Sequence, residues 1–282
     1  MESFRTVDGR TLAYRREGAG PLLVCHPGGP GFSSRYFGDL AGLGESFTLI
    51  LLDPRGTGGS DHPAEARAYE TADYAADLDE LRAHLGLERM LLLGHSHGGV
   101  VAAAYAAAHP ERVERLVLAS TLARFAAEQE AVMEAAMNAK AAEPWYADAR
   151  AALEDEQAGR FETDEELGEL AIREFPFYFA RYGAAEEAYL DTLRGEVPVA
   201  DALLLFNNEI FTTFDLRPDL PKITAPTLVI TGEDDFITGP VCAADFASIP
   251  QVTTVLLPNC GHFIFVEAGD RFGEETTLFL LD

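Results

Sequence analysis

Residues 90–99, MLLLGHSHGG, decide the fold of this chain. The apolar run 90–93 ends in Gly94, and the alanine-rich run VVAAAYAAAH follows at 100–109. This pattern predicts a buried strand, a sharp turn and a helix. The five residues at the turn, GHSHG, match G-x-S-x-G, in which small residues on both sides allow a serine hydroxyl to project above the sheet. The sequence therefore predicts that Ser96 is a nucleophile.

Strand and helix patterns alternate on both sides of this turn. Short apolar runs occur at 21–26, 47–53, 113–120, 225–232 and 252–258, with helical patterns between many of them. Such runs are typical of parallel strands buried on both faces, so we expect an α/β fold with a mostly parallel sheet flanked by helices. Residues 121–219 read as helices only. We therefore predict a core formed by 1–120 and 220–282, with a helical cap at 121–219 inserted before the last strands, where binding sites form in open parallel sheets.

Composition excludes several classes of protein. The net charge of −26 argues against binding to nucleic acid, which needs a basic face, and against docking on anionic membranes. The amino-terminal residues lack the pattern of a signal peptide, and no window of about 18 residues is continuously apolar. Three cysteines lie far apart, at 25, 242 and 260, which fits neither a disulfide framework nor a zinc site. We expect a cytoplasmic protein.

The two histidines beside Ser96 are poor candidates for its general base, because adjacent side chains diverge in a tight turn. The better candidate is His262, in the segment NCGHF just after the last apolar run. Asp235, in GEDDF, is the predicted acid that orients the histidine, with Asp234 as the alternative. The chain order serine, aspartate, histidine is the order that a strand-turn-helix nucleophile of this kind requires.

A glycine-rich turn, HPGGPG at 26–31, follows the first of the buried runs. Glycines allow backbone N–H groups to approach a substrate oxygen closely. We expect the N–H of Gly29, or of Gly28, to form an oxyanion hole together with the backbone N–H of His97. Removing one such donor typically lowers the rate about 100- to 1000-fold.

Several motifs together resemble a known family. GGPG at 28–31, DPRGTGGSD at 53–61, GHSHGG at 94–99, GEDDFIT at 232–238 and GHF at 261–263 occur in the order found in α/β-hydrolase-fold serine hydrolases. The first two segments resemble those of the proline iminopeptidase (prolyl aminopeptidase) branch. The resemblance implies hydrolysis of an amino-terminal residue, or of a small ester or amide, without a cofactor. It also implies that cap glutamates bind the free amine of the substrate, and Glu209 in FNNEIF is the best match.

Other functions remain open from the residues alone. A carboxylesterase or lactonase acting on small acyl esters would use the same triad. A non-catalytic ligand-binding protein on this fold would need no intact triad. A metal site built on His95 and His97 is disfavoured because metal sites need three or four converging ligands, so we predict no metal. In each case the expected partner is a small molecule or a short peptide.

Overall fold

The computed structural model describes residues 1–65 and 67–282. Its centre is an eight-stranded sheet with the order β1-β2-β4-β3-β5-β6-β7-β8. Both pairings of β2 are antiparallel, and the strands from β4 to β8 run parallel to one another. This confirms the expected α/β fold. The strands are β1 (Glu2–Arg5), β2 (Thr11–Gly18), β3 (Leu22–His26), β4 (Thr48–Asp53), β5 (Met90–His95), β6 (Val113–Ala119), β7 (Thr227–Gly232) and β8 (Val252–Leu257).

Helices cover both faces of the sheet, which explains why the strands read as continuous apolar runs. Along β5, Met90 and Leu92 belong to the core on one face, whereas Leu91 and Leu93 belong to the core on the other. The first core includes residues of α1 (Thr71–His84), α2 (His97–Ala108) and α8 (Pro240–Ala244), and the second includes residues of α9 (Ile264–Glu267) and α10 (Gly269–Leu281). This alternation has the two-residue period of a strand.

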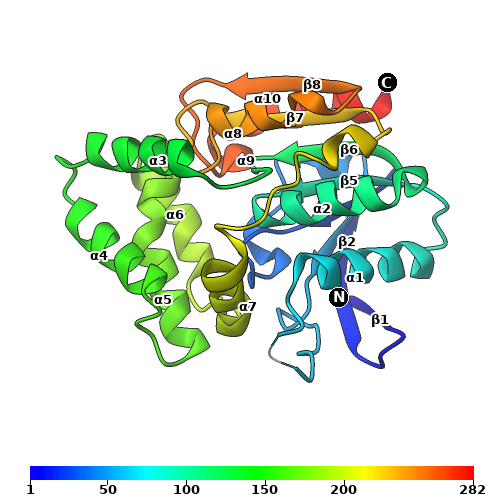
Figure 1. Cartoon of the computed structure of the whole chain (residues 1–282), viewed down its shortest axis with the longest axis horizontal. Coiled ribbons are helices and arrows are strands. Elements are labelled where there is room, and N and C mark those ends of the chain that lie inside the picture. The colour runs from blue at the N-terminus through cyan, green and yellow to red at the C-terminus, as the bar shows by residue number, and fades with distance from the viewer. Residues whose placement is uncertain (66) are drawn as a thin grey trace.

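A group of helices lies between β6 and β7 in sequence and beyond the carboxyl ends of these strands in space (Figure 1). Arg124 and Asp215 form an isolated β-bridge that brings the two ends of the segment together. We call residues 121–219 the helical insertion. Its helices are α3 (Ala127–Ala139), α4 (Tyr146–Gln157), α5 (Asp164–Glu174), α6 (Ala184–Leu193) and α7 (Ala200–Leu205).

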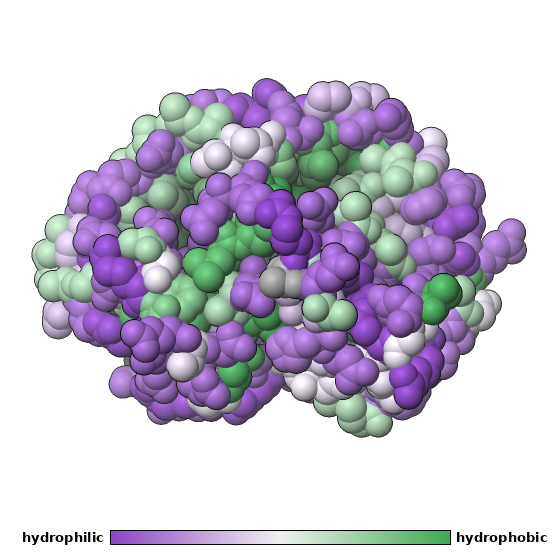
Figure 2. All heavy atoms as spheres, turned by 60° about the horizontal axis from the view of Figure 1, so that its bottom comes forward, coloured by the Kyte–Doolittle hydropathy of each residue, from purple (hydrophilic) through white to green (hydrophobic). Residues whose placement is uncertain are grey.

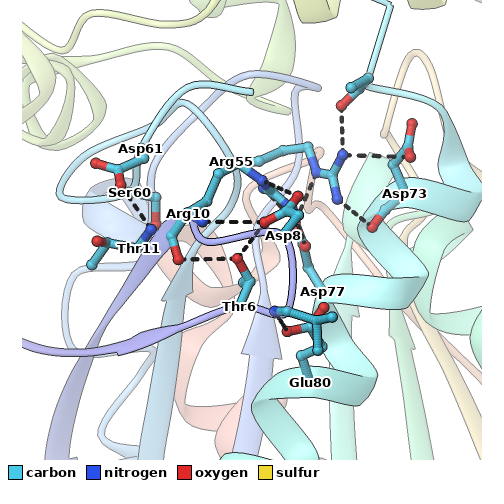
Figure 3. Close-up of polar contacts among 12 residues, drawn as sticks. Thr6, Asp8, Arg10, Thr11, Arg55, Ser60, Asp61, Asp73, Asp77 and Glu80 are labelled. Atoms are coloured by element: carbon cyan, nitrogen blue, oxygen red, sulfur yellow. Dashed lines mark hydrogen bonds and ion pairs between the residues drawn. The ribbon is translucent and has the colours of Figure 1, made fainter. Parts of the chain in front are cut away.

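A buried ionic network connects the loop after β4 to α1 and to the first hairpin (Figure 3). Arg55 donates to the carboxylate of Asp77 at 2.7 Å, and Arg10 donates to the same carboxylate at 2.9 Å. Arg55 also donates to the backbone carbonyls of Ala68 and Asp73. Because two guanidinium groups share one buried carboxylate, the loop after β4, helix α1 and the first hairpin are held in a fixed arrangement. Within the described ranges, no helix is long and apolar enough to cross a membrane.

Candidate active site

Ser96 occupies the turn between β5 and α2 in a strained conformation. Its φ of 55° and ψ of −125° lie in a region that residues other than glycine rarely adopt. The turn is possible only because its neighbours are small. A Cβ atom on Gly94 would overlap the carbonyl of Gly98, and one on Gly98 would overlap the carbonyl of His26. The serine is thus held at the amino-terminal end of α2, where the helix dipole favours developing negative charge.

Asp235 and His262 are brought together by the loops after β7 and β8. The Oδ2 atom of Asp235 lies 2.9 Å from Nδ1 of His262, and both side chains are buried. Burial alone would raise the pKa of Asp235, but the charge and hydrogen bond of His262, with hydrogen bonds from Thr238, lower it to about 2. An ionised Asp235 accepts a hydrogen bond from Nδ1 of His262 and so favours the tautomer with the proton on Nδ1, which is the one that the predicted role of His262 requires. Asp234, the alternative acid, has an exposed side chain.

The glycine-rich loop at residues 26–31, which we call the oxyanion loop after its predicted role, passes close to Ser96. A Cβ atom on Gly28 would lie 2.7 Å from Cβ of Ser96, so only glycine permits this approach. The N–H of Gly28 already donates to the hydroxyl of Tyr36 at 2.5 Å. The N–H of Gly29 has no such acceptor among the described residues, which favours Gly29 as the donor. His97 is the first residue of α2, where backbone N–H groups lack partners within the helix.

The loop that carries His262 is held by the helical insertion as well as by the sheet. The N–H of His262 donates to the carbonyl of Tyr178 at 2.6 Å. The carboxyl group of Glu267 accepts from the N–H of Gly261 at 2.7 Å and from that of Ala180 at 2.9 Å. Burial raises the pKa of Glu267 to about 7. One carboxyl group therefore spans the histidine loop and the insertion.

Two adjoining cavities open at Ser96. The smaller, of about 90 Å³, is lined by Ser96 and His262 together with Gly28 and Gly29. The larger, of about 280 Å³, is lined by Ser96, His97 and mainly apolar residues. The apolar residues of the larger cavity are Leu122, Phe125, Met133, Leu153, Leu203, Phe206, Phe211 and Ile237. A recess with hydrophobic side chains, bordered by hydrophilic ones, is visible on the face shown in Figure 2.

Comparison with known proteins agrees with this geometry. The family model for the alpha/beta hydrolase fold matches residues 21–269. The chain belongs to the alpha/beta hydrolase fold family. It is 28% identical over 277 residues to a proline iminopeptidase of Pestalotiopsis fici, with 96% of each chain covered. It is also 28% identical to a proline iminopeptidase of Lactobacillus delbrueckii subsp. lactis, with 90% of this chain and 87% of the relative covered.

Solved structures resemble this alpha/beta hydrolase over its whole length. The proline iminopeptidase of Mycobacterium smegmatis is 25% identical, with a TM-score of 0.74 and coverage of 99% of this chain and 97% of the other. The enol-lactonase of Burkholderia xenovorans is 26% identical, with a TM-score of 0.76 and complete coverage of both chains. The protein is therefore a hydrolase, and its relatives include proline iminopeptidases and an enol-lactonase.

Two glutamates of the insertion, Glu174 buried and Glu156 half-buried, line the smaller cavity of this hydrolase. Glu174, at the end of α5, is 2% exposed, and its Oε2 atom has no hydrogen-bond partner in the described part of the chain. Glu156, on α4, accepts from the side-chain amide of Asn207 at 3.1 Å and lines both cavities. Burial, followed by the charge of Glu156, raises the pKa of Glu174 well above its usual value, and burial also raises the pKa of Glu156.

The sequence does not distinguish these two glutamates, and the residue expected to bind an amine is Glu209. The structure places Glu209 at the surface, where its two oxygens pair with Arg67 at 2.8 and 2.7 Å. Its side chain is 48% exposed and lines neither cavity at Ser96. The turn at 206–210 buries Phe206 and directs Glu209 outward. The available signal for Glu174 was its place directly before the aromatic stretch FPFYF.

The two histidines beside Ser96 face different surroundings. The ring of His97 packs against Tyr74 and Phe206, with centroid distances of 5.3 and 4.8 Å. The ring of His95 lies 4.8 Å from that of His262. Burial lowers the pKa of both flanking histidines to about 3, so both rings are neutral. The described residues contain no group of three or more side chains placed to hold a metal ion.

Proposed function

We propose that this alpha/beta hydrolase uses Ser96, His262 and Asp235 as a catalytic triad and removes an amino-terminal residue from a short peptide or small amide. The observation that carries the proposal is the position of Glu156 and Glu174. Both carboxyl groups line the cavity that Ser96 and His262 also line. A substrate with a free amine next to its scissile carbonyl would place an ammonium group beside these carboxyl groups.

The chemistry follows from the positions of the three groups. Ser96 attacks the carbonyl carbon while Nε2 of His262 removes the hydroxyl proton, and Asp235 stabilises the resulting imidazolium. The backbone N–H groups of Gly29 and His97 stabilise the oxyanion. His262 then gives the proton to the leaving amine, which departs and leaves an acyl-enzyme. A water molecule, deprotonated by His262, hydrolyses this ester and regenerates Ser96.

The glutamate pair is suited to an ammonium group because no lysine or arginine of the described residues forms an ion pair with either carboxyl group. The residues that line the smaller cavity include no lysine or arginine. Two carboxyl groups at close range cannot both ionise readily, so without a cation they retain a proton at a raised pKa. A bound ammonium group supplies the missing charge and a donor for the unpartnered Oε2 atom of Glu174.

Substitution of the pair tests the proposal. We expect Glu174→Gln to lower kcat/KM for alanyl- and prolyl-p-nitroanilide by about 10- to 100-fold, the usual loss for a hydrogen bond to a charged group. The same variant should change hydrolysis of p-nitrophenyl acetate, which has no amine, by less than about 2-fold. Glu156→Gln should act in the same direction. Steady-state kinetics of the wild-type enzyme and both variants on the three substrates measure the effect.

Two matched controls make this result specific. Glu169→Gln changes an exposed carboxylate on the same helix as Glu174, and Glu209→Gln changes the surface carboxylate that the sequence favoured. Both variants should retain the wild-type preference between amide and ester. An equal loss of both activities in Glu174→Gln would contradict amine recognition and leave only a structural role for this residue.

The raised pKa of Glu174 also predicts a pH dependence. As pH falls, Glu174 takes up a proton first because its pKa is raised the more, and one negative charge remains on the pair. The pair becomes uncharged and loses its attraction for an ammonium group when Glu156, whose pKa is also raised by burial, is protonated as well. The KM for alanyl-p-nitroanilide should therefore rise at low pH, whereas the KM for p-nitrophenyl acetate should not. In Glu174→Gln the difference between the two profiles should shrink. Identical KM profiles for both substrates in the wild-type enzyme would contradict this assignment.

A carboxylesterase or lactonase is the second candidate. It is favoured by the larger, mainly apolar cavity at Ser96 and by the likeness to the enol-lactonase. This function predicts that p-nitrophenyl butyrate or a small lactone is hydrolysed faster than any aminoacyl nitroanilide. It also predicts that the glutamate variants affect neither class selectively. A non-catalytic binding protein would instead fail to react with a fluorophosphonate at Ser96.

A further inference from the structure

His95, the residue directly before the nucleophile, is hydrogen-bonded through both of its ring nitrogens. Its Nε2 atom lies 3.0 Å from the carbonyl oxygen of His262, and its Nδ1 atom lies 2.8 Å from the hydroxyl of Tyr36. The hydroxyl of Tyr36 is also the acceptor for the N–H of Gly28. Both His95 and Tyr36 are buried, with 1% and 5% of their surfaces exposed.

The partners determine the direction of every hydrogen bond in this chain. A carbonyl oxygen only accepts, so Nε2 of His95 must carry the proton. The Nδ1 atom of the neutral ring is then an acceptor, and the hydroxyl of Tyr36 must donate to it. The oxygen of Tyr36 remains able to accept from Gly28. The chain therefore runs in one direction, from the oxyanion loop through Tyr36 and His95 to the backbone of His262.

The neutral ring needed for this arrangement is the stable form of His95. Burial, reinforced by the neighbouring His262, lowers the pKa of His95 to about 3. The charge of Asp235 and the hydrogen bond to the backbone of His262 act in the opposite direction and raise the pKa of His95, but by less than burial lowers it. The ring is also confined by aromatic neighbours, with Phe265 at 5.2 Å and Phe263 stacked at 6.2 Å between centroids.

We propose that His95 is a positioning residue that fixes the oxyanion loop and the His262 loop relative to Ser96. The inference rests on the proposed triad, because it gives these loops their chemical roles. His95 belongs to the strand that delivers the nucleophile, so a single side chain connects three parts of the site. Displacement of reacting groups by about 1 Å lowers rates by about 100-fold, which makes such a connection important to catalysis.

Kinetics of three variants test the role of the chain. His95→Leu removes both hydrogen bonds, and we expect it to lower kcat by about 10- to 100-fold with little change in KM. Tyr36→Phe breaks the chain at its middle and should lower kcat in the same way. The double variant should be no slower than His95→Leu, because both substitutions interrupt one chain. His95→Gln retains a donor and an acceptor and should recover most of the lost rate.

The rate of fluorophosphonate labelling at Ser96 separates this inference from the proposed function. If the wild-type enzyme is not labelled, the triad proposal fails. If it is labelled and His95→Leu is labelled equally fast, the triad stands and the positioning role is overturned. Circular dichroism and thermal unfolding identify variants that do not fold.

A measurement on the wild-type protein keeps the inference testable without substitutions. ¹⁵N NMR of the imidazole rings should show His95 as the Nε2–H tautomer throughout pH 5–9. It should also show the Nδ1–H proton of His262 slowed in exchange with water. Detection of His95 as the Nδ1–H tautomer, or as a titrating imidazolium in this range, would contradict the proposed chain.

Discussion

Ser96→Ala is expected to lower kcat by on the order of 10⁴- to 10⁶-fold, the range seen when a triad serine is removed. The substitution deletes the atom that forms the acyl-enzyme, so only oxyanion stabilisation and substrate binding remain. Alanine keeps the Cβ atom and the small volume of the turn, so the fold should persist. Burst kinetics with p-nitrophenyl acetate and intact-mass analysis after fluorophosphonate treatment measure the loss of acylation.

A serine far from the site provides the control for this experiment. Ser248 lies exposed between β7 and β8, outside both cavities, and Ser248→Ala should retain full labelling and activity. Labelling of folded Ser96→Ala at the wild-type rate would show that another residue is the nucleophile. Slow turnover by Ser96→Ala without labelling would be explained by oxyanion stabilisation and substrate binding, which this variant retains.

Asp235→Asn should produce the next largest effect, a fall in kcat of about 10⁴-fold. The side-chain carbonyl of asparagine can still accept from the N–H groups of Ile237 and Thr238, which Oδ1 of Asp235 accepts at 3.0 Å. Its amide nitrogen would then face Nδ1 of His262 as a donor. The histidine would be held with its proton on Nε2, directed at Ser96, and would be unable to act as a base. Steady-state kinetics give the loss, and imidazole ¹⁵N NMR gives the tautomer.

The adjacent aspartate distinguishes this mechanism from a general loss of charge. Asp234 has an exposed side chain, and Asp234→Asn should change kcat by less than about 2-fold. A larger loss in Asp234→Asn than in Asp235→Asn would reverse the assignment of the acid. Equal, small effects in both variants would remove the aspartate from the proposed triad.

The parts of this molecule that the sequence predicted are those set by local patterns. The central strands are buried on both faces, so their apolar runs mark them clearly, and the motif residues follow directly from the strand ends. Ser96, Asp235 and His262 could be proposed as a triad because each lies in a short loop after such a strand. The strand β1, with the sequence ESFR, was not predicted, because it is a short edge strand whose residues are mostly exposed and form no apolar run.

The glutamate pair could not be predicted for a different reason. The helical insertion is rich in acidic residues, and most of them look alike in sequence. Only the packing of α4 against α5 distinguishes Glu156 and Glu174 from exposed neighbours such as Glu169. The hydrogen-bond chain through His95 likewise depends on Tyr36 and His262, which lie 59 and 167 residues from it. A pattern of neighbouring residues in the sequence cannot indicate contacts between residues so far apart.

The bond between the N–H of His262 and the carbonyl of Tyr178 has a consequence for exchanging parts between related enzymes. His262, the proposed base, is held in place by residues of two different regions, so the helical insertion is not an interchangeable module. A chimaera that receives a foreign insertion for new specificity must keep the stretch around Tyr178 and Ala180, or its histidine loop will lose its support. The foreign segments should therefore be joined inside the insertion, before and after this stretch, and not at the two ends of the insertion.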